Sequence, residues 1–447
     1  MYIGSRTPRR RDSPWRVLVL TILIIGGLYV LREQLTGASW ARPFDATPTP
    51  TRSSESYFDE AEALYDEGLL DPAIDAYRNA VNKDPQDNLA LYRLARLMVY
   101  RHRTTEVLAQ YGVRLQDEEL GDARTFAVLG LALDWHAAQN EEQLLPVYLE
   151  LGVISPEEVQ SEDWIYDHDR MAEELVRAAQ KACERALRLD ADLPEGYAYL
   201  AEALADRERF DEALATAETG LELNPNLPDT QRALAFVYEK QGQYEEALQA
   251  YAAAIEAHPR LGFLYLSLGR NQRAIGYEMD LDGRWQDATP YFEQAVAAFE
   301  EAIKLDPADP TGYDEIGWTY GHYMGDDREM KQRGVDYLEE AITQDPEYGL
   351  AYRHLGQVYY DLRNYEETII SLDKAIEIGG LAPADAVLSQ IMLGWSHYAL
   401  DRADDEIEDP CAQALPHFQA AWDVLDQLTQ RELGLESLTQ QGLDTCN

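Results

Sequence analysis

The sequence predicts an all-α fold, an α-solenoid of about eight helix–turn–helix units that follows one hydrophobic N-terminal helix. Three observations support this prediction. Small residues recur at fixed spacings with a period of 34 residues, each period contains two amphipathic stretches of about 13 residues, and a separate apolar run lies near the N-terminus. A repeat of this length is one supersecondary unit, which buries its apolar stripe only by stacking on copies of itself.

Each repeat contains a small residue that is followed 12, 19 and 24 positions later by two more small residues and by a proline or glycine. Four copies fit this spacing, and they begin at Ala61, Ala201, Ala235 and Gly356. Small residues let two paired helices approach closely, and the final proline cannot continue a helix because it lacks an amide hydrogen. Residues 88–121 contain a weaker copy. The spacing therefore predicts pairs of helices.

Four further copies carry extra residues between their first and second helices. These insertions lie at about 139–176, 277–290, 322–328 and 401–409. Since equivalent turns of stacked units line one edge, we expect the insertions to decorate a single ridge. The repeats occupy residues 54–430, and residues 431–447 are predicted to form a C-terminal capping helix and tail.

The first 53 residues differ from the rest. Residues 1–16 are basic, residues 17–34 contain an uncharged apolar run, and residues 35–53 form a linker rich in proline, threonine and serine. We interpret residues 17–34 as a transmembrane signal-anchor helix. Cations before the run outnumber those just after it, which predicts a single-pass plasma-membrane protein with a cytoplasmic N-terminus and extracytoplasmic repeats. The alternative is secretion after cleavage near Ala41.

The repeat resembles the tetratricopeptide repeat (TPR) family, whose unit is a 34-residue helix–turn–helix with this small-residue pattern and a closing proline. The resemblance covers about residues 54–425. It implies a right-handed superhelix in which the first helix of each pair lines a concave face. It also implies that this face binds protein or peptide partners.

The charge balance argues against nucleic acid as a partner. The chain has 82 acidic and 38 basic residues, and its net charge is −44. Binding to nucleic acid requires cations that replace condensed counterions, so we expect no nucleic-acid partner. The eight histidines show no spacing of paired metal ligands, and no phosphate-binding loop or nucleophile motif is present. We therefore expect no metal, no cofactor and no catalytic activity.

The inward positions of the first helices give a candidate peptide-binding groove. Its residues are Tyr92, Arg96, Arg232, Phe236, Arg270, Arg273, Trp318, Arg353, Gln357 and Tyr360. Arginine is scarce in this chain, yet four arginines gather at these positions in the later repeats. They either bind carboxylates of a partner peptide or neutralise neighbouring acidic residues between repeats. Both alternatives remain open on the sequence alone.

A second candidate surface is the insertion ridge, where Trp164, Ile165, Tyr166 and Trp285 either bind a partner or attach the insertions to the solenoid. Cys411 and Cys446 are a candidate disulfide if the repeats lie outside the cytoplasm, and otherwise two unpaired thiols. The leading functional hypothesis is a non-catalytic, membrane-anchored protein–protein interaction scaffold or adaptor. The alternatives are a self-associating structural protein of the cell envelope, which would be a homo-oligomer, and an accessory subunit of an envelope enzyme.

Overall fold

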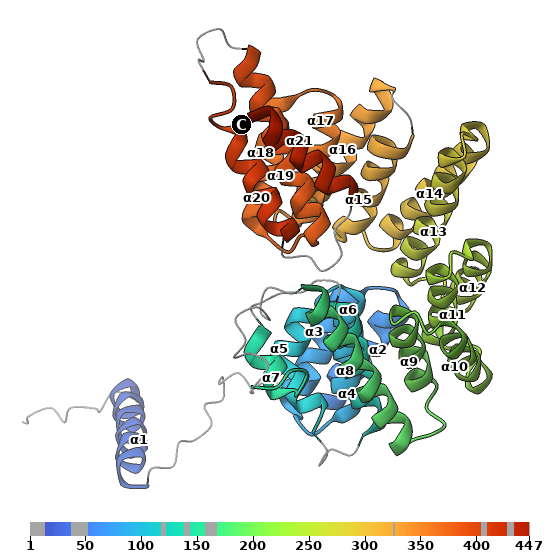
Figure 1. The fold of residues 1–447 in the computed structure, drawn as a ribbon. Helices are drawn as coiled ribbons and strands as arrows, with labels where there is room; N and C mark the ends of the chain where they lie inside the picture. Colours follow the sequence, from blue (N-terminus) through green and yellow to red (C-terminus); the bar gives the residue numbers. More distant parts are fainter. Residues whose placement is uncertain are drawn as a thin grey trace, which may run out of the picture. The chain divides into compact units, whose positions relative to one another are not determined.

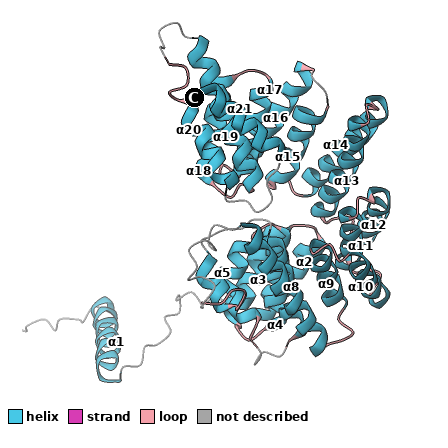
Figure 2. Cartoon of the chain, viewed as in Figure 1, coloured by secondary structure: helices cyan, strands magenta, loops and turns pink. Residues whose placement is uncertain are grey.

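The computed structural model describes eight stretches of the chain: residues 14–36, 52–117, 122–137, 144–156, 168–324, 327–403, 409–426 and 433–446. Within these stretches all regular structure is helical, and Figure 2 shows no strand in them. The chain divides into two compact units, residues 1–52 and residues 53–447. The second unit contains every predicted repeat, which agrees with one continuous solenoid.

The first unit contains the predicted hydrophobic helix as α1 (Pro14–Thr36), with 23 residues. Its described apolar side chains are exposed, up to 70% for Trp15. No helix in the described part of the chain is both long enough and apolar enough to cross a membrane. Residues 1–13 and most of the predicted linker lie outside the described residues.

The second unit is a series of helical pairs, which Figure 1 follows from blue to red. The described residues contain nine pairs: α2 (Ser54–Asp66) with α3 (Leu70–Lys83), α4 (Asn88–Tyr100) with α5 (Thr104–Leu115), α6 (Ala123–Ala137) with α8 (His168–Leu189), α9 (Pro194–Asp206) with α10 (Phe210–Leu223), α11 (Pro228–Lys240) with α12 (Tyr244–Ala257), α13 (Gly262–Leu281) with α14 (Trp285–Leu305), α15 (Pro310–Trp318) with α16 (Arg328–Gln344), α17 (Gly349–Asp361) with α18 (Tyr365–Ile378), and α19 (Pro383–Ala403) with α20 (Ala414–Asp426). Nine pairs are one more than the predicted eight units, because the four close copies, the weaker copy at 88–121 and the four interrupted copies each form one pair.

The turn inside six of these pairs contains one residue in the left-handed region. These residues are Gly68, His102, Glu208, Gly242, Gly283 and Arg363. Only glycine adopts this conformation without a steric cost, so the three other residues are held there by the helices on either side. The recurrence of the same turn confirms that the helices repeat as units.

Close helix–helix approach explains the small residues of the repeat. A Cβ atom added at Gly130 on α6 would collide with the Cys183 sulfur on α8, and one added at Gly269 would lie 2.5 Å from Phe299 Cε1. Gly130 and Cys183 are separated by the longest insertion, yet their helices pack as a pair. Cys183 is fully buried.

The insertions differ in form from simple loops. At 277–290 the extra residues lengthen both helices, so that α13 has 20 residues and α14 has 21. At 322–328 the first helix continues into the π-helix η2 (Thr319–Tyr323). At 401–409 the extra residues partly extend α19. Insertion 139–176 was expected on an exposed ridge, but its short helix α7 (Leu145–Glu150) buries a tyrosine against the solenoid.

The aromatic residues of the predicted ridge are only partly described. Trp285 begins α14, where its ring lies 5.9 Å from that of Phe292. Within insertion 139–176, Tyr148 of α7 contacts His136 of α6 through a 2.7 Å hydrogen bond. Trp164, Ile165 and Tyr166 lie outside the described residues. Tyr148 therefore attaches insertion 139–176 to α6, whereas the ring contact of Trp285 lies within α14.

The C-terminal end is closed by α21 (Leu433–Cys446), which packs on α19 and α20. A disulfide joins Cys411, just before α20, to Cys446 at the end of α21, with the two Cα atoms 5.3 Å apart. This is the pairing that the sequence offered as a candidate. It closes a loop of 35 residues around the last helical pair.

Candidate functional site

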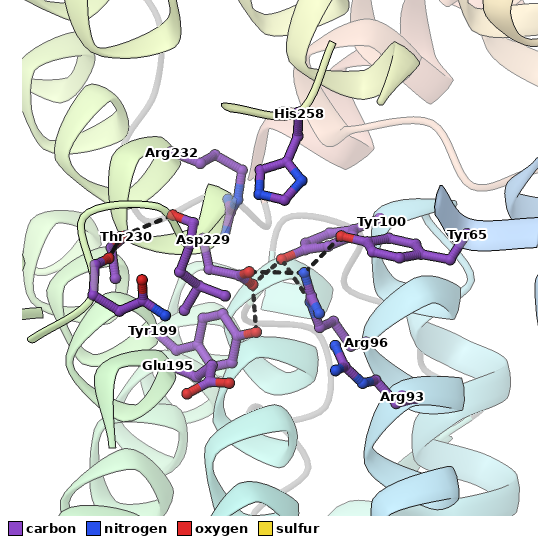
Figure 3. A network of polar contacts seen from close by, with 12 residues as sticks. Tyr65, Arg93, Arg96, Tyr100, Glu195, Tyr199, Asp229, Thr230, Arg232 and His258 are labelled. Carbon is purple, nitrogen blue, oxygen red and sulfur yellow. Dashed lines mark hydrogen bonds and ion pairs between the residues drawn. The ribbon is translucent and has the colours of Figure 1, made fainter. Parts of the chain in front are cut away.

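The first helices of the pairs carry a buried polar network that joins repeats far apart in the sequence. Its centre is Asp229 on α11 (Figure 3). Arg96 of α4 donates a hydrogen bond of 2.8 Å to Asp229 Oδ2, and Tyr199 of α9 donates one of 2.6 Å to Asp229 Oδ1. Tyr100 of α4 also donates to Oδ1. Because Arg96 and Asp229 are 133 positions apart, the array curves until its second pair meets its fifth.

Asp229 is held in its charged form by these partners. Burial alone would raise the pKa of its carboxyl, but Arg96, Arg232 and the hydrogen bonds from Tyr100 and Tyr199 outweigh burial and lower the pKa. Arg96 also donates a 3.0 Å hydrogen bond to Tyr65 of α2. The network therefore satisfies a buried charge while it fixes four first helices to one another.

A second ion pair lies beside this network. Arg232 donates from both terminal nitrogens to the two carboxylate oxygens of Glu202, whose side chain is fully buried. Trp135 of α6 donates a 3.1 Å hydrogen bond to the same carboxylate. The Arg232 guanidinium carbon lies 5.0 Å from the Trp135 ring centroid and 5.4 Å from that of Tyr100. This geometry combines a bidentate pair with cation–π contacts.

The arginines of the later repeats are paired in the same way. Arg270 and Arg273 of α13 both bind Glu315 of α15, and Arg353 of α17 lies 2.8 Å from Asp385 of α19. Each of these pairs crosses from one repeat to the next. All five predicted groove arginines, Arg96 included, thus contact acidic residues of this chain, which favours the second of the two sequence alternatives.

Arg101 makes a further cross-link between distant repeats. It follows α4, and its guanidinium lies 2.7 Å from Asp71 of α3 and 3.4 Å from Asp306, which follows α14. It also pairs with Asp309, just before α15. These contacts hold the turn after α4, in the second helical pair, against the start of α15, in the seventh pair.

Two neighbouring cavities open where the array curves back on itself. The first has a volume of about 320 Å³. Its walls come from α4, α6, α9, α11, α12 and α13, together with the turns after α4 and before α15. They consist of Tyr100, His102, Asp134, Trp135, Asp206, Arg232, Phe236, Glu239, Lys240, Tyr251, Phe263, Leu266, Ser267, Arg270, Asp309 and Thr311. We call it the inner cavity.

The second cavity has a volume of about 720 Å³ and reaches from Asp71 to the turn after α18 at Gly380. It shares four lining residues with the inner cavity: His102, Arg270, Asp309 and Thr311. The two cavities are therefore contiguous, and we call them together the inner groove. Both volumes fall near or within the range of ligand-binding clefts, about 300–1,000 Å³.

The predicted groove residues divide into three groups. Arg232, Phe236 and Arg270 line the inner cavity. Tyr92 and Arg96 are buried between helices and contribute to packing and to the Asp229 network. The remaining residues lie elsewhere: Arg273, Trp318, Arg353, Gln357 and Tyr360.

Trp318 forms the centre of a separate stack. Its ring lies parallel to those of His322 and His354, with centroids 4.2 Å and 4.3 Å away. Arg353 places its guanidinium 5.2 Å from the same ring, and Gln357 contacts His322 at 3.5 Å. Tyr360 is partly buried against Tyr365. These side chains fill space between repeats and do not line the inner groove.

The sequence prediction placed Glu239 at an inward position but missed other residues that line the inner cavity, above all Asp134 and Lys240. A signal for Asp134 was present, because it follows Gly130 by four residues. Tyr65 follows Ala61 by the same interval. Extending that interval through the interrupted repeat would have placed Asp134 on the inner face. The described residues contain no group of three His, Cys, Asp or Glu side chains that could hold a metal ion.

Two family models, both described as tetratricopeptide repeat, match residues 226–301 and 331–386. Curated proteins gave no match. Among solved structures, TTC0263, a thermophilic TPR protein of Thermus thermophilus, is 20% identical; the match covers 45% of this chain and 98% of that one, with a TM-score of 0.38.

A match to YrrB, a TPR protein with an unusual peptide-binding site, has 21% identity, covers 44% of this chain and 93% of that one, and has a TM-score of 0.30. The human IFIT1 dimer with m7Gppp-AAAA is 14% identical, with 89% and 82% of the two chains covered and a TM-score of 0.47. The two family matches support tetratricopeptide repeats at residues 226–301 and 331–386, and the other helical pairs repeat the same two-helix unit.

Proposed function

We propose that this chain is a non-catalytic scaffold or adaptor that binds a protein or peptide segment in the inner groove. The observation that carries the proposal is the groove itself, a pair of contiguous cavities at the point where distant repeats meet. Tetratricopeptide repeats generally serve protein binding, and here the arginine–carboxylate pairs hold the groove walls in place. Preformed walls lower the entropic cost of ordering a bound segment.

Affinity capture with a groove-blocking variant tests the proposal. Ala308 lines the larger cavity and is exposed, so Ala308→Trp should fill the groove without disturbing the helices. Ala215 of α10 is equally exposed and lies outside the groove, so Ala215→Trp is the matched control. The full chain, solubilised in mild detergent, is used as bait and captured proteins are identified by mass spectrometry. Partners lost with Ala308→Trp and kept with Ala215→Trp support the proposal, and equal capture by both contradicts it.

The chain's attachment to a membrane belongs to the same proposal. We propose that residues 17–34 anchor it and that the repeats lie outside the cytoplasm. The exposed apolar side chains of α1 support the first part, and the Cys411–Cys446 disulfide supports the second because such bonds persist in oxidising compartments. Fractionation of cells that express the full chain, with alkaline washing of membranes, tests the anchor against a chain that lacks residues 1–52. Recovery of both chains in the soluble fraction would contradict it.

Self-association is the second candidate role, since a solenoid that binds copies of itself would build an envelope structure. Light scattering of the detergent-solubilised full chain over a range of concentrations separates the two roles. A constant monomeric mass supports the adaptor, and a mass that increases with concentration supports the structural protein. An accessory subunit of an envelope enzyme would instead co-purify with that enzyme in the capture experiment.

A further inference from the structure

Asp134 on α6 lines the inner cavity with a carboxylate that has no hydrogen-bond partner. Asp134 is 3% exposed, and neither of its carboxylate oxygens, Oδ1 and Oδ2, accepts a hydrogen bond from a donor among the described residues. A buried carboxylate without a donor costs several kcal/mol in a folded protein, on the order of the penalty for an unpaired buried charge. A buried carboxyl of this kind either takes up a proton or receives a donor from outside the chain.

Three other buried carboxylates of the first helices have partners. Asp229 accepts from Arg96 and two tyrosines, and Glu202 accepts from Arg232 and Trp135. Asp314 contacts a histidine at 2.8 Å. The lack of a partner at Asp134 is therefore not a general property of this inner face.

The cations that line the inner cavity are already paired with other acids. Lys240 lies 2.6 Å from Asp206, Arg232 binds Glu202, and Arg270 binds Glu315. These three pairs leave the Asp134 carboxylate uncompensated. Burial, followed by the charges of Asp206 and Glu202, raises the pKa of Asp134.

Glu239 on α11 adds a second carboxylate to the same cavity. It accepts hydrogen bonds from two neutral donors, Tyr251 at 3.1 Å and Asn271 at 2.8 Å, and both contact its Oε2 atom. The structure records no ion pair between Glu239 and a cation among the described residues. The cavity therefore presents two carboxylates, Asp134 and Glu239, without a matching positive charge.

The remaining walls suit an alkyl or planar cationic group. Trp135, Phe236 and Phe263 also line this cavity, and their rings provide apolar surface for the methylene groups of a long side chain. The volume of about 320 Å³ lies at the lower end of the range for ligand clefts, a size that suits one side chain. The shared residue His102 connects this space to the larger cavity, which has room for the chain on either side.

We propose that the inner cavity binds one lysine or arginine side chain of a partner peptide, with Asp134 and Glu239 as its counter-charges. This rests on the proposed function and names the chemistry of the partner. The net charge of −44 would draw a basic segment toward the groove and increase its rate of association. The bound ammonium or guanidinium would supply the donors that Asp134 lacks.

Defined fluorescent peptides test the proposal with the full chain in detergent. The probes are acetylated Gly/Ser nonapeptides that carry one central lysine, arginine, norleucine or glutamate, and binding is followed by fluorescence anisotropy. Lysine or arginine peptides should bind at least about tenfold more tightly than the norleucine peptide, the factor expected for one charge-assisted hydrogen bond. Equal affinity of the lysine and norleucine peptides, or no binding of any cationic peptide at millimolar concentration, would overturn the proposal.

Variants assign the preference to the two carboxylates. Asp134→Asn and Glu239→Gln should each reduce the affinity ratio of the lysine peptide to the norleucine peptide about tenfold. Each variant deletes one counter-charge but keeps the shape of the side chain. Glu218→Gln, at an exposed position on α10, is the matched control for net charge and should retain the preference. Circular dichroism melts establish that the variants fold. Unchanged preference in folded Asp134→Asn and Glu239→Gln would overturn the proposal.

Two further experiments distinguish a pocket for a peptide side chain from a site for small amines, and the cation pocket from the proposed peptide-binding function. Agmatine and cadaverine present the same cations without a peptide, and binding of either as tightly as the arginine or lysine peptide would overturn the assignment to a peptide side chain. Partner capture with Ala308→Trp tests the proposed function independently. Capture that depends on the groove but is unaffected by Asp134→Asn and Glu239→Gln would overturn only the cation pocket.

Discussion

The polar network around Asp229 and the inner cavity beside Asp134 each contain a buried aspartate on the first helix of a pair. Asp229 receives hydrogen bonds from Arg96, Tyr100 and Tyr199, and it joins the second pair to the fifth. Asp134 receives none and faces a cavity. The comparison shows that burial of a charge does not by itself reveal its role. A saturated carboxylate holds repeats together, whereas an unsaturated one beside a cavity marks a place for a ligand.

The largest effect should come from breaking the saturated site. Arg96→Ala leaves Asp229 buried without its closest cation, which should lower the free energy of unfolding by about 3–5 kcal/mol. Urea unfolding followed by circular dichroism measures the loss. Arg188→Ala removes an exposed pair with Glu184 on α8 and should change stability by less than about 1 kcal/mol. Equal losses in the two variants would show that the Asp229 network does not join the repeats.

Glu315 is an intermediate case, because its carboxylate is buried but its partner Arg270 is partly exposed. Burial would raise the pKa of its carboxyl, but Arg270 and Arg273 outweigh burial and lower the pKa to about 2. A depressed pKa stabilises the fold above the unfolded value of about 4.3, and the stabilisation is lost as the pH falls toward 2.

Glu315→Gln should therefore cost about 2 kcal/mol at pH 7, a figure reduced for the solvent exposure of Arg270, and this difference from wild type should vanish near pH 2. Urea midpoints between pH 2 and 7 measure it. Glu293→Gln, at an exposed site on α14, should show a flat difference across this range. A pH-independent cost at Glu315 would show that its charge is not what stabilises the pair.

The stability contributed by Asp134 should depend on pH in the opposite direction to that contributed by Glu315. Because the pKa of Asp134 is raised, the unliganded fold loses stability as the pH rises above the unfolded value of about 3.9. Asp206, Glu202, Lys240 and Arg232 act on this carboxyl, and the two acids outweigh the two cations.

Asp134→Asn removes the titration, so it should be as stable as wild type near pH 4 and more stable than wild type at pH 6. Thermal melts of the unliganded full chain at the two pH values measure this change. A variant that is less stable than wild type at pH 6 would place Asp134 among the structural carboxylates.

The smallest effect should come from removing one donor at Asp229. Tyr199→Phe deletes a 2.6 Å hydrogen bond but leaves Arg96 and Tyr100 in place, and should cost about 1.5 kcal/mol. Tyr197→Phe, two residues away on the same helix, deletes an exposed hydrogen bond to Ala191 and should cost less than about 0.5 kcal/mol. The ratio of the two losses in urea unfolding measures how strongly the network depends on each donor.

The helical pairs could be predicted because small residues mark each close contact. Gly130 and Ala179 illustrate this, since these small residues indicated a pair despite the long insertion between them, and a Cβ atom at Gly130 would lie 3.0 Å from the Ala179 carbonyl oxygen. The form of the insertion at 277–290 could not be predicted from that spacing. Its 14 residues are divided between α13 and α14, and seven residues are close to two helical turns, so the inner face keeps its direction.

The site was less accessible to sequence reasoning than the fold. A period of 34 residues predicts that neighbouring repeats touch, but the contact of Arg96 with Asp229 depends on how far the whole array curves. Small differences in packing at each repeat accumulate to that curvature, and no single spacing encodes it. The pairing of Arg232 with Glu202 depends on the same curvature only weakly, because adjacent repeats supply both residues.

The Cys411–Cys446 disulfide has a consequence for how the array comes apart. In a linear stack each repeat is stabilised by its neighbours, so the last repeat has half the support of an internal one and opens first. The disulfide joins the chain just before α20 to the end of α21 and so increases the free energy needed to open the last repeat. The first repeat has no such bond among the described residues. A reductant should therefore increase amide hydrogen exchange in α19 to α21 and leave the helices around the inner groove protected.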